Sequence, residues 1–242
     1  MNTDLLSLFT DWKAVIKKNN SALADLFTLD GAFPGYTSAF PKILFIGRES
    51  RFAPTGDRIS SDMAWFKTLS PDDGLGSYWR RIISMVYMIQ AGGKCAPEQL
   101  PDARDILAQM KATDNYGFAI MNISKYLNTA DDSGTSNFNL INQFLKDSEL
   151  DKRNFIREEI ELLKPDIIIT ANLWDCRIKR KYIDMIFPPK DMSAPVCDSK
   201  NKVCLQNFRL NGRTIKRLDT YHFSCPGNDQ ELFYDPIMEV LF

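Results

Sequence analysis

The sequence has no long apolar run, few cysteines and no excess of charge of either sign. No stretch approaches the roughly 18–20 apolar residues that a membrane-spanning helix needs. The first residues, 1–12, have neither the basic start nor the small-residue cleavage site of a secretory signal. These absences predict a cytoplasmic protein that has no membrane partner.

The five cysteines are an odd number, are widely spaced and include no CxxC pair. A disulfide framework needs paired cysteines, and zinc and iron–sulfur sites usually bring ligands close together in the sequence. We therefore expect free thiols in a reducing compartment, with no metal and no iron–sulfur cluster.

The charge of the chain is nearly balanced, at −1. Nucleic-acid-binding modules usually carry a basic excess that neutralises phosphates, so this balance argues against such a module for the chain as a whole. Residues 177–217 differ, because eleven Lys and Arg stand there against three Asp, a local excess of eight positive charges. This segment either attracts a polyanion or is an ordinary solvated surface, and the sequence leaves both interpretations open.

The length and composition fit a single domain. A chain of 242 residues with 44% hydrophobic residues can bury one sizeable core. We expect one domain over residues 1–242, with an N-terminal helical segment at 1–40, a core at 42–227 and a C-terminal helix at 229–242. Apolar residues recur at helical spacing from Leu5 to Ile16, which predicts an amphipathic helix at the start.

Three short apolar runs are typical of strands buried on both faces: 42–47, 117–123 and 166–171. Helical patterns separate these runs. Three lie between the first and second runs, at 60–69, 78–90 and 102–111, and two lie between the second and third, at 138–147 and 152–163. Strands that alternate with helices indicate an α/β fold with a parallel sheet. Near the end, Asn211-Gly212 predicts a hairpin between strands at 203–210 and 213–220.

Polar residues follow several of these strands. Ligands of open parallel sheets bind beyond the carboxyl ends of the strands, where Glu49, Asn122 and His222 are expected to meet. A carboxylate, an amide and an imidazole at one edge predict an active site. Each residue is also compatible with a purely structural role. Glu49 could form a surface ion pair, Asn122 could bond neighbouring backbone groups, and His222, the only histidine, could simply pack in the fold.

Taken together, these motifs resemble the uracil-DNA glycosylase superfamily, most closely its divergent bacterial members. The first strand ends in Gly47-Arg48-Glu49, the second carries Asn122-Ile123-Ser124-Lys125, the third reads Leu163–Ile169, and His222-Phe223-Ser224 comes late. The similarity spans about residues 42–227. Glu49 is followed by Ser50 where better-known members have proline and tyrosine after the acid, and Phe223 stands where proline is usual.

The resemblance implies a three-layer α/β/α fold with a central, mostly parallel four-stranded sheet. It implies hydrolysis of the N-glycosidic bond between uracil or another damaged base and deoxyribose in DNA, by a monomer without a metal or other cofactor. Cleavage of this bond develops positive charge on the sugar and negative charge on the base. A carboxylate and a hydrogen-bond donor each stabilise that transition state more than the ground state.

By motif position, the resemblance implies Glu49 as the carboxylate that activates water and His222 as the group that stabilises the departing base. Asn122 would bind the flipped base, and an aromatic ring would stack on it; the candidates are Phe52, Trp65, Tyr78 and Trp79, of which Phe52 directly follows the first motif. The implied DNA contacts are Arg51, Ser124, Lys125 and Ser224.

Two other functions are compatible with the sequence. One is a catalytically inactive nucleic-acid-binding protein on the same fold, which would use residues 177–217. The other is a small-molecule esterase or nucleoside hydrolase. The absence of a GxSxG motif, a phosphate-binding glycine loop and Asp-rich metal clusters argues against the latter.

Overall fold

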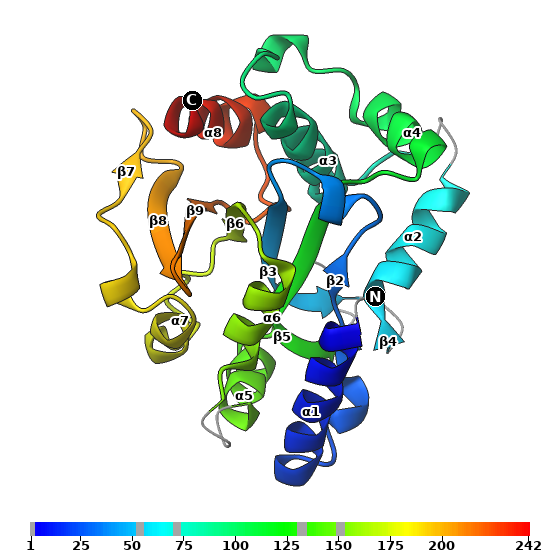
Figure 1. Cartoon of the computed structure of the whole chain (residues 1–242), viewed down its shortest axis with the longest axis vertical. Coiled ribbons are helices and arrows are strands. Elements are labelled where there is room, and N and C mark those ends of the chain that lie inside the picture. The colour runs from blue at the N-terminus through cyan, green and yellow to red at the C-terminus, as the bar shows by residue number, and fades with distance from the viewer. Residues whose placement is uncertain (1–2, 52–55, 70–73, 130–134, 149–152) are drawn as a thin grey trace.

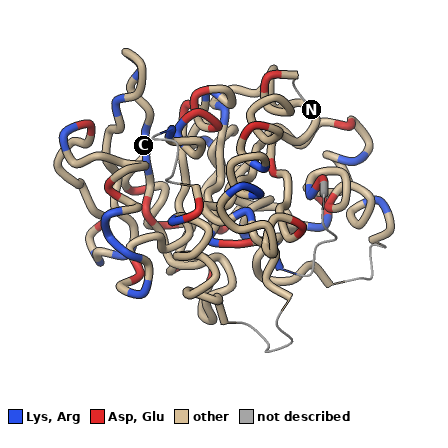
Figure 2. The backbone as a smooth tube through the Cα atoms, turned by 90° about the horizontal axis from the view of Figure 1, so that it is seen from below, with Lys and Arg blue, Asp and Glu red and all other residues tan. Residues whose placement is uncertain are grey.

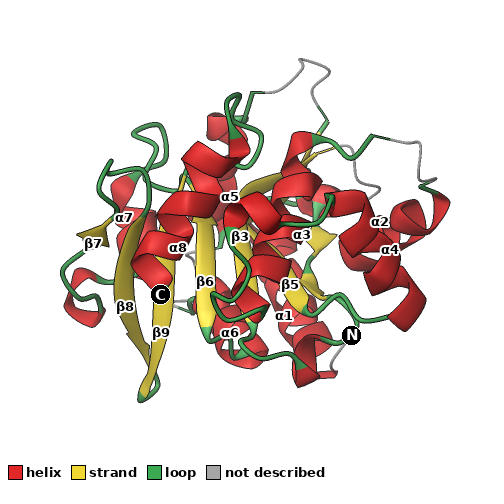
Figure 3. Cartoon of the chain, turned by 90° about the horizontal axis from the view of Figure 1, so that it is seen from above, coloured by secondary structure: helices red, strands yellow, loops and turns green. Residues whose placement is uncertain are grey.

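One mixed β-sheet of seven strands lies at the centre of the described part of the chain (Figure 1). The computed structural model describes residues 3–51, 56–69, 74–129, 135–148 and 153–242. In spatial order the strands are β2 (Gly31–Ala32), β5 (Phe118–Asn128), β3 (Ile43–Arg51), β6 (Ile167–Ala171), β9 (Arg213–Thr220), β8 (Cys204–Leu210) and β7 (Val196–Cys197). Figure 3 shows the order from β7 to β5. Two further short strands, β1 (Thr28–Leu29) and β4 (Gly56–Asp57), pair in parallel outside this sheet.

The central strands β5, β3, β6 and β9 run parallel, and β2, β8 and β7 are antiparallel to their neighbours. The predicted α/β class and the five predicted strands are confirmed. The implied number of four strands is too small, since seven lie in the sheet over the described residues. The hairpin extends the sheet through β9 and β8, and the two-residue strands β2 and β7 are too short to produce a periodic pattern.

Helices pack against both faces of the sheet. Within the described residues they are α1 (Thr3–Asn19), α2 (Arg58–Thr68), α3 (Ser77–Gln90), α4 (Ala103–Thr113), α5 (Phe138–Asp147), α6 (Phe155–Leu163), α7 (Arg180–Ile186) and α8 (Asp235–Leu241). Leu44 and Ile46 of β3 contribute to the core on the side of α1, α5, α6 and α7, and Ile43 and Phe45 to the core on the side of α2, α3, α4 and α8. This alternation is what a strand buried on both faces requires.

The C-terminal helix forms despite Pro236. A π-helix over Gln230–Tyr234 leads directly into α8, and Pro236 lies in the first turn of α8. Proline is tolerated there because the first N–H groups of a helix have no intrahelical partner.

Asparagine and aspartate side chains cap several helices. Asn137 caps α5, since its Oδ1 accepts a hydrogen bond from the backbone N–H of Leu140 at 3.0 Å. Asp57, Asp102 and Asn154 play the same role for α2, α4 and α6. The cap at Asn137 also fixes the backbone N–H that donates a hydrogen bond to Oε1 of Glu49.

The structure corrects the expectation for the cysteines. Cys197 and Cys204 are opposite one another on β7 and β8 and form a disulfide. The expectation of free thiols is wrong for this pair, and the argument from thiols to a reducing compartment no longer holds. Within the described ranges, no helix is both long enough and apolar enough to cross a membrane.

Candidate functional site

The carboxyl ends of the parallel strands bring the predicted polar residues to one edge of the sheet. In the register of β3 and β5, Gly47 is opposite Asn122 and Glu49 is opposite Ser124. His222 follows β9, which is separated from β3 only by β6. This edge is where open parallel sheets bind ligands.

The carboxylate of Glu49 is held through one of its two oxygens. Oε1 accepts hydrogen bonds from Nδ2 of Asn128 at 3.0 Å and from the backbone N–H of Asn137 at 2.9 Å. Oε2 is buried and has no hydrogen-bond partner among the described residues. Burial raises the pKa of Glu49 above its ordinary value, against the opposing effect of these hydrogen bonds and of Arg51 and Arg48. The carboxylate of Glu49 is therefore held in place through Oε1, while Oε2 makes no hydrogen bond within the described residues.

Arg48 ties β3 to the segment that follows β6. Its guanidinium donates two hydrogen bonds to the carbonyl oxygen of Asn172, at 3.2 and 2.9 Å, and lies 3.2 Å from a carboxylate oxygen of Asp175. Asn172 has a positive φ of 51°, which turns the chain at the end of β6. The hydrogen bond from Arg177 is the largest of the effects that lower the pKa of Asp175 to about 2, so this carboxylate stays ionised beside Arg48.

Asn122 is enclosed between the strands. Its backbone N–H donates to Oδ2 of Asp30 at 2.6 Å, its side-chain nitrogen donates to Oγ of Ser50 at 3.1 Å, and the residue is 1% exposed. The carboxamide lies directly beside Gly47, where a Cβ atom would overlap Oδ1 of Asn122. A residue without a side chain is therefore needed at position 47.

We expect Gly47→Ala to lower the free energy of unfolding by about 1–3 kcal/mol, because the added methyl group overlaps the Asn122 carboxamide. Urea denaturation measures this change. Gly74→Ala is the matched control, since a Cβ there meets no atom within 4 Å. In an Asn122→Ala background the cost of Gly47→Ala is expected to fall, and an unchanged cost would show that the overlap is not its cause.

A buried arginine organises the loop that carries His222. Arg81 of α3 is 1% exposed and donates to the carbonyl oxygens of Phe223 at 2.7 Å, Cys225 at 2.6 Å and Gly227 at 3.3 Å. It also forms an ion pair with Asp229 at 2.8 Å. One guanidinium thus fixes the backbone over residues 223–229.

The imidazole of His222 is neutral at physiological pH. Burial, followed by the positive charges of Arg48, Arg51 and Arg81, lowers the pKa of His222 to about 4. Nδ1 accepts a hydrogen bond from the backbone N–H of Ser224 at 3.2 Å, so the neutral ring carries its proton on Nε2. Glu49 lies near the carboxyl end of β3 and His222 follows β9 in the same sheet, and the positive charges of Arg48 and Arg51 lower the pKa of both residues.

Two of the implied DNA contacts are not at the surface. Lys125 is 0% exposed, and its ammonium group lies 2.7 Å from Asp30 and 2.7 Å from Glu159. Ser124 is also 0% exposed. The structure therefore gives neither side chain an open face toward a phosphate. Arg51 is half-buried at the end of β3, Ser224 is exposed, and Phe52 lies outside the described residues.

The basic segment 177–217 is less positive at its surface than in the sequence. Four of its arginines form ion pairs within the described residues: Arg177 with Asp175, Arg180 with Asp184, Arg213 with Asp166, and Arg217 with Asp219. Arg217 is 0% exposed. Figure 2 shows basic and acidic residues interspersed along the chain. The inactive DNA-binding function stays a prediction.

Comparison with known proteins adds no relative. No protein-family model, curated protein or solved structure matches this chain. The resemblance to the uracil-DNA glycosylase superfamily therefore rests on the short sequence motifs and stays a prediction. No cluster of three or more His, Cys, Asp or Glu that could hold a metal ion is found in the described ranges.

Several residues that build this edge are not singled out by the sequence patterns. Asn128 and Asn137 orient Glu49, Asp30 holds the backbone at Asn122, and Arg81 fixes the loop at His222. Arg81 had a detectable signal, since the apolar residues Met85 and Met88 follow it at i+4 and i+7, on the same face of a predicted helix. The others depend on contacts between segments far apart in the chain.

Proposed function

We propose that this protein is a hydrolase of the uracil-DNA glycosylase type, with that superfamily's fold, which releases uracil or another damaged base from DNA. The observation that carries the proposal is the pair formed by Glu49 and His222. Oε2 of Glu49 has no hydrogen-bond partner among the described residues, the imidazole of His222 is neutral with its proton on Nε2, and both residues lie at the carboxyl edge of the parallel strands.

Each group has a defined part in the proposed reaction. Glu49 accepts a proton from the attacking water and stabilises the positive charge that develops on the sugar. His222 donates its Nε2 proton in a hydrogen bond to the oxygen of the departing base, whose negative charge grows as the glycosidic bond breaks. Arg48 and Arg51 add positive charge near this departing anion.

Asn122 is proposed to contact the base through its carboxamide oxygen. The side-chain nitrogen is committed to Ser50, so the oxygen beside Gly47 is the group left for recognition. Exposed Ser224 and half-buried Arg51 are the proposed contacts to the DNA backbone. A base that is mispaired or unpaired is the preferred substrate because extruding it from the stack costs least.

The deciding experiment measures base release from oligonucleotides that carry one uracil, hypoxanthine or xanthine, single-stranded or in a duplex. Alkaline cleavage at the abasic site reports the product. We expect release of at least one of these bases, and a loss of roughly 100-fold in His222→Phe, which removes the donor but keeps a ring against Tyr78.

Tyr221→Phe is the matched control, because it removes a hydroxyl from the exposed neighbouring residue. No release of any of these bases by the folded wild-type protein would refute the proposal. Binding to the same oligonucleotides without release would then favour the inactive nucleic-acid-binding alternative.

A further inference from the structure

A cavity of about 740 Å³ lies away from the proposed active site. Lys42 and Lys164, which precede the amino ends of β3 and β6, contribute to its lining, whereas Glu49 lies at the opposite end of β3. Neither Glu49, Asn122 nor His222 lines this cavity. Its volume is within the range of small-molecule sites, about 300–1,000 Å³.

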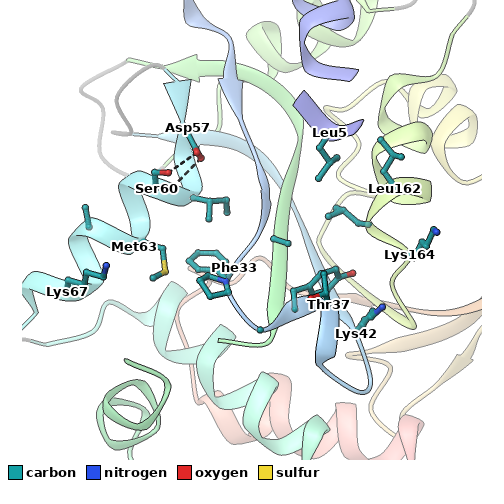
Figure 4. Close-up of a pocket in the computed structure, with 17 residues that line it drawn as sticks. Leu5, Phe33, Thr37, Lys42, Asp57, Ser60, Met63, Lys67, Leu162 and Lys164 are labelled. Carbon is teal, nitrogen blue, oxygen red and sulfur yellow. Dashed lines mark hydrogen bonds between the residues drawn. The ribbon is translucent and has the colours of Figure 1, made fainter. Parts of the chain in front are cut away.

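Part of the cavity wall is apolar. Leu5, Ile59, Met63 and Leu162 line it together with the buried ring of Phe33. In Figure 4, Phe33 and Met63 lie between Lys67 on one side and Lys42 with Lys164 on the other. Aliphatic side chains and a flexible thioether suit an apolar chain better than a flat aromatic ring.

The charge of the cavity is not balanced. Lys42, Lys67 and Lys164 line it, and among the described residues none of the three forms an ion pair. The acid in the described lining, Asp57, is already engaged. Asp57, which caps α2, accepts hydrogen bonds from the backbone and hydroxyl of Ser60 at 3.2 and 2.7 Å.

Asp166 is likewise engaged, because it accepts from the backbone N–H of Lys42 at 2.9 Å and pairs with Arg213 at 3.2 Å. Its carboxylate is thus bound to the main chain at Lys42 and to a separate cation. The positive charge of the lysine side chains therefore remains for a ligand.

We propose that this cavity binds an anionic amphiphile, that is, an unbranched acyl or alkyl chain that ends in a carboxylate or a phosphate ester. The head group pairs with Lys42 and Lys164, which Figure 4 shows on the same side of the cavity, and the chain lies across Phe33 and Met63. Two ammonium groups at one wall complement a negative head, and the aliphatic lining complements the chain.

Isothermal titration calorimetry of the full chain tests this with four ligands of equal chain length: decanoate, decyl phosphate, decanol and decyltrimethylammonium, each below its micelle concentration. We expect decanoate or decyl phosphate, or both, to bind at least tenfold more tightly than decanol, and the cationic ligand to bind least. Comparison of the two anions shows whether the cavity prefers a carboxylate or a phosphate ester as the head group.

Two variants locate the site. Lys42→Met with Lys164→Met is expected to weaken binding of the anion at least tenfold and to leave decanol nearly unchanged. Ala64→Trp, which places a large side chain at an exposed lining position, is expected to weaken all the ligands. Lys94→Met with Lys146→Met is the control, since it removes two exposed lysines that do not line the cavity.

Equal binding of decanol and the two anions would overturn the proposal, as would an unchanged affinity in the Lys42/Lys164 variant. Circular dichroism of each variant establishes that it is folded, and Ala64→Trp gives an independent result if the lysine variant does not fold. Base release is expected to be the same in these variants as in the wild type, so this result does not depend on the proposed glycosylase activity.

Discussion

Glu49→Gln is expected to lower the rate of base release roughly 100- to 10,000-fold, which is the range that a general base contributes. The substitution is nearly isosteric, and its carbonyl oxygen can still accept from Asn128 and from the backbone of Asn137. It removes the negative charge and the ability to take a proton from water. Binding of the oligonucleotide is therefore expected to survive while release is lost.

Glu161→Gln is the matched control, because it makes the same chemical change at another partly exposed glutamate, on α6. Single-turnover kinetics separate the chemical step from binding. Equal release by the wild type and Glu49→Gln would exclude Glu49 as the base and would require another group to activate the water.

The pH dependence of release gives an independent check on the same residue. Burial raises the pKa of Glu49, so the wild-type rate is expected to fall as the pH drops through that raised pKa and the carboxylate becomes protonated. His222 stays neutral well below pH 6 because its pKa is about 4. The acidic limb therefore belongs to Glu49, and its persistence in Glu49→Gln would contradict the assignment.

The positions of the long elements could be predicted because local sequence determines them. The run at 42–47 is short and apolar at nearly every position, which favours a strand buried on both faces, and β3 is found there. Asn211-Gly212 specified the turn between β8 and β9 through its two positive φ angles. By contrast, β7 and α7 are only two and seven residues long, and neither has enough residues for a periodic signal.

The site could be predicted only as far as topology determines it. The order of strands and helices along the chain was enough to predict that Glu49 and His222 lie at the same edge of the sheet. The roles of Ser124 and Lys125 depend on burial, and the sequence does not show which residues enclose a side chain. The disulfide likewise depends on the pairing of β7 with β8, which no local pattern indicates.

Lys125→Met is expected to lower the free energy of unfolding at pH 8 by about 3–5 kcal/mol, the cost of breaking a buried ion pair by removing one partner. The ammonium group lies 2.7 Å from Asp30 and from Glu159, and all three side chains are 0% exposed. It also lies over the rings of Phe9 and Trp12, at 5.7 and 5.4 Å from their centroids. Methionine has nearly the same volume as lysine, so the substitution leaves little empty space beside these rings. The loss of stability therefore measures the effect of removing the positive charge.

The cost of Lys125→Met is expected to be smaller at pH 5 than at pH 8. Burial raises the pKa of Glu159 to about 7 even with the lysine present, and loss of the lysine raises it further. A carboxyl group whose pKa is higher in the folded state than in the unfolded state loses stability as the pH rises above the unfolded value, about 4.3. At pH 5 the folded variant can bury Glu159 as a neutral acid, whereas at pH 8 it must either bury the charge unpaired or hold the proton at a cost.

Urea denaturation at both pH values measures this difference. Lys146→Met, at an exposed position on α5, is the control and is expected to change stability by no more than about 0.5 kcal/mol at either pH. A cost below about 1 kcal/mol, or one that is equal at pH 5 and pH 8, would mean that the carboxylates beside Lys125 are not what makes this lysine necessary. Because Asp30 also accepts the backbone N–H of Asn122 at 2.6 Å, the same ion pair holds the strand that carries the proposed base contact. Loss of Lys125 is therefore expected to reduce base release as well as stability.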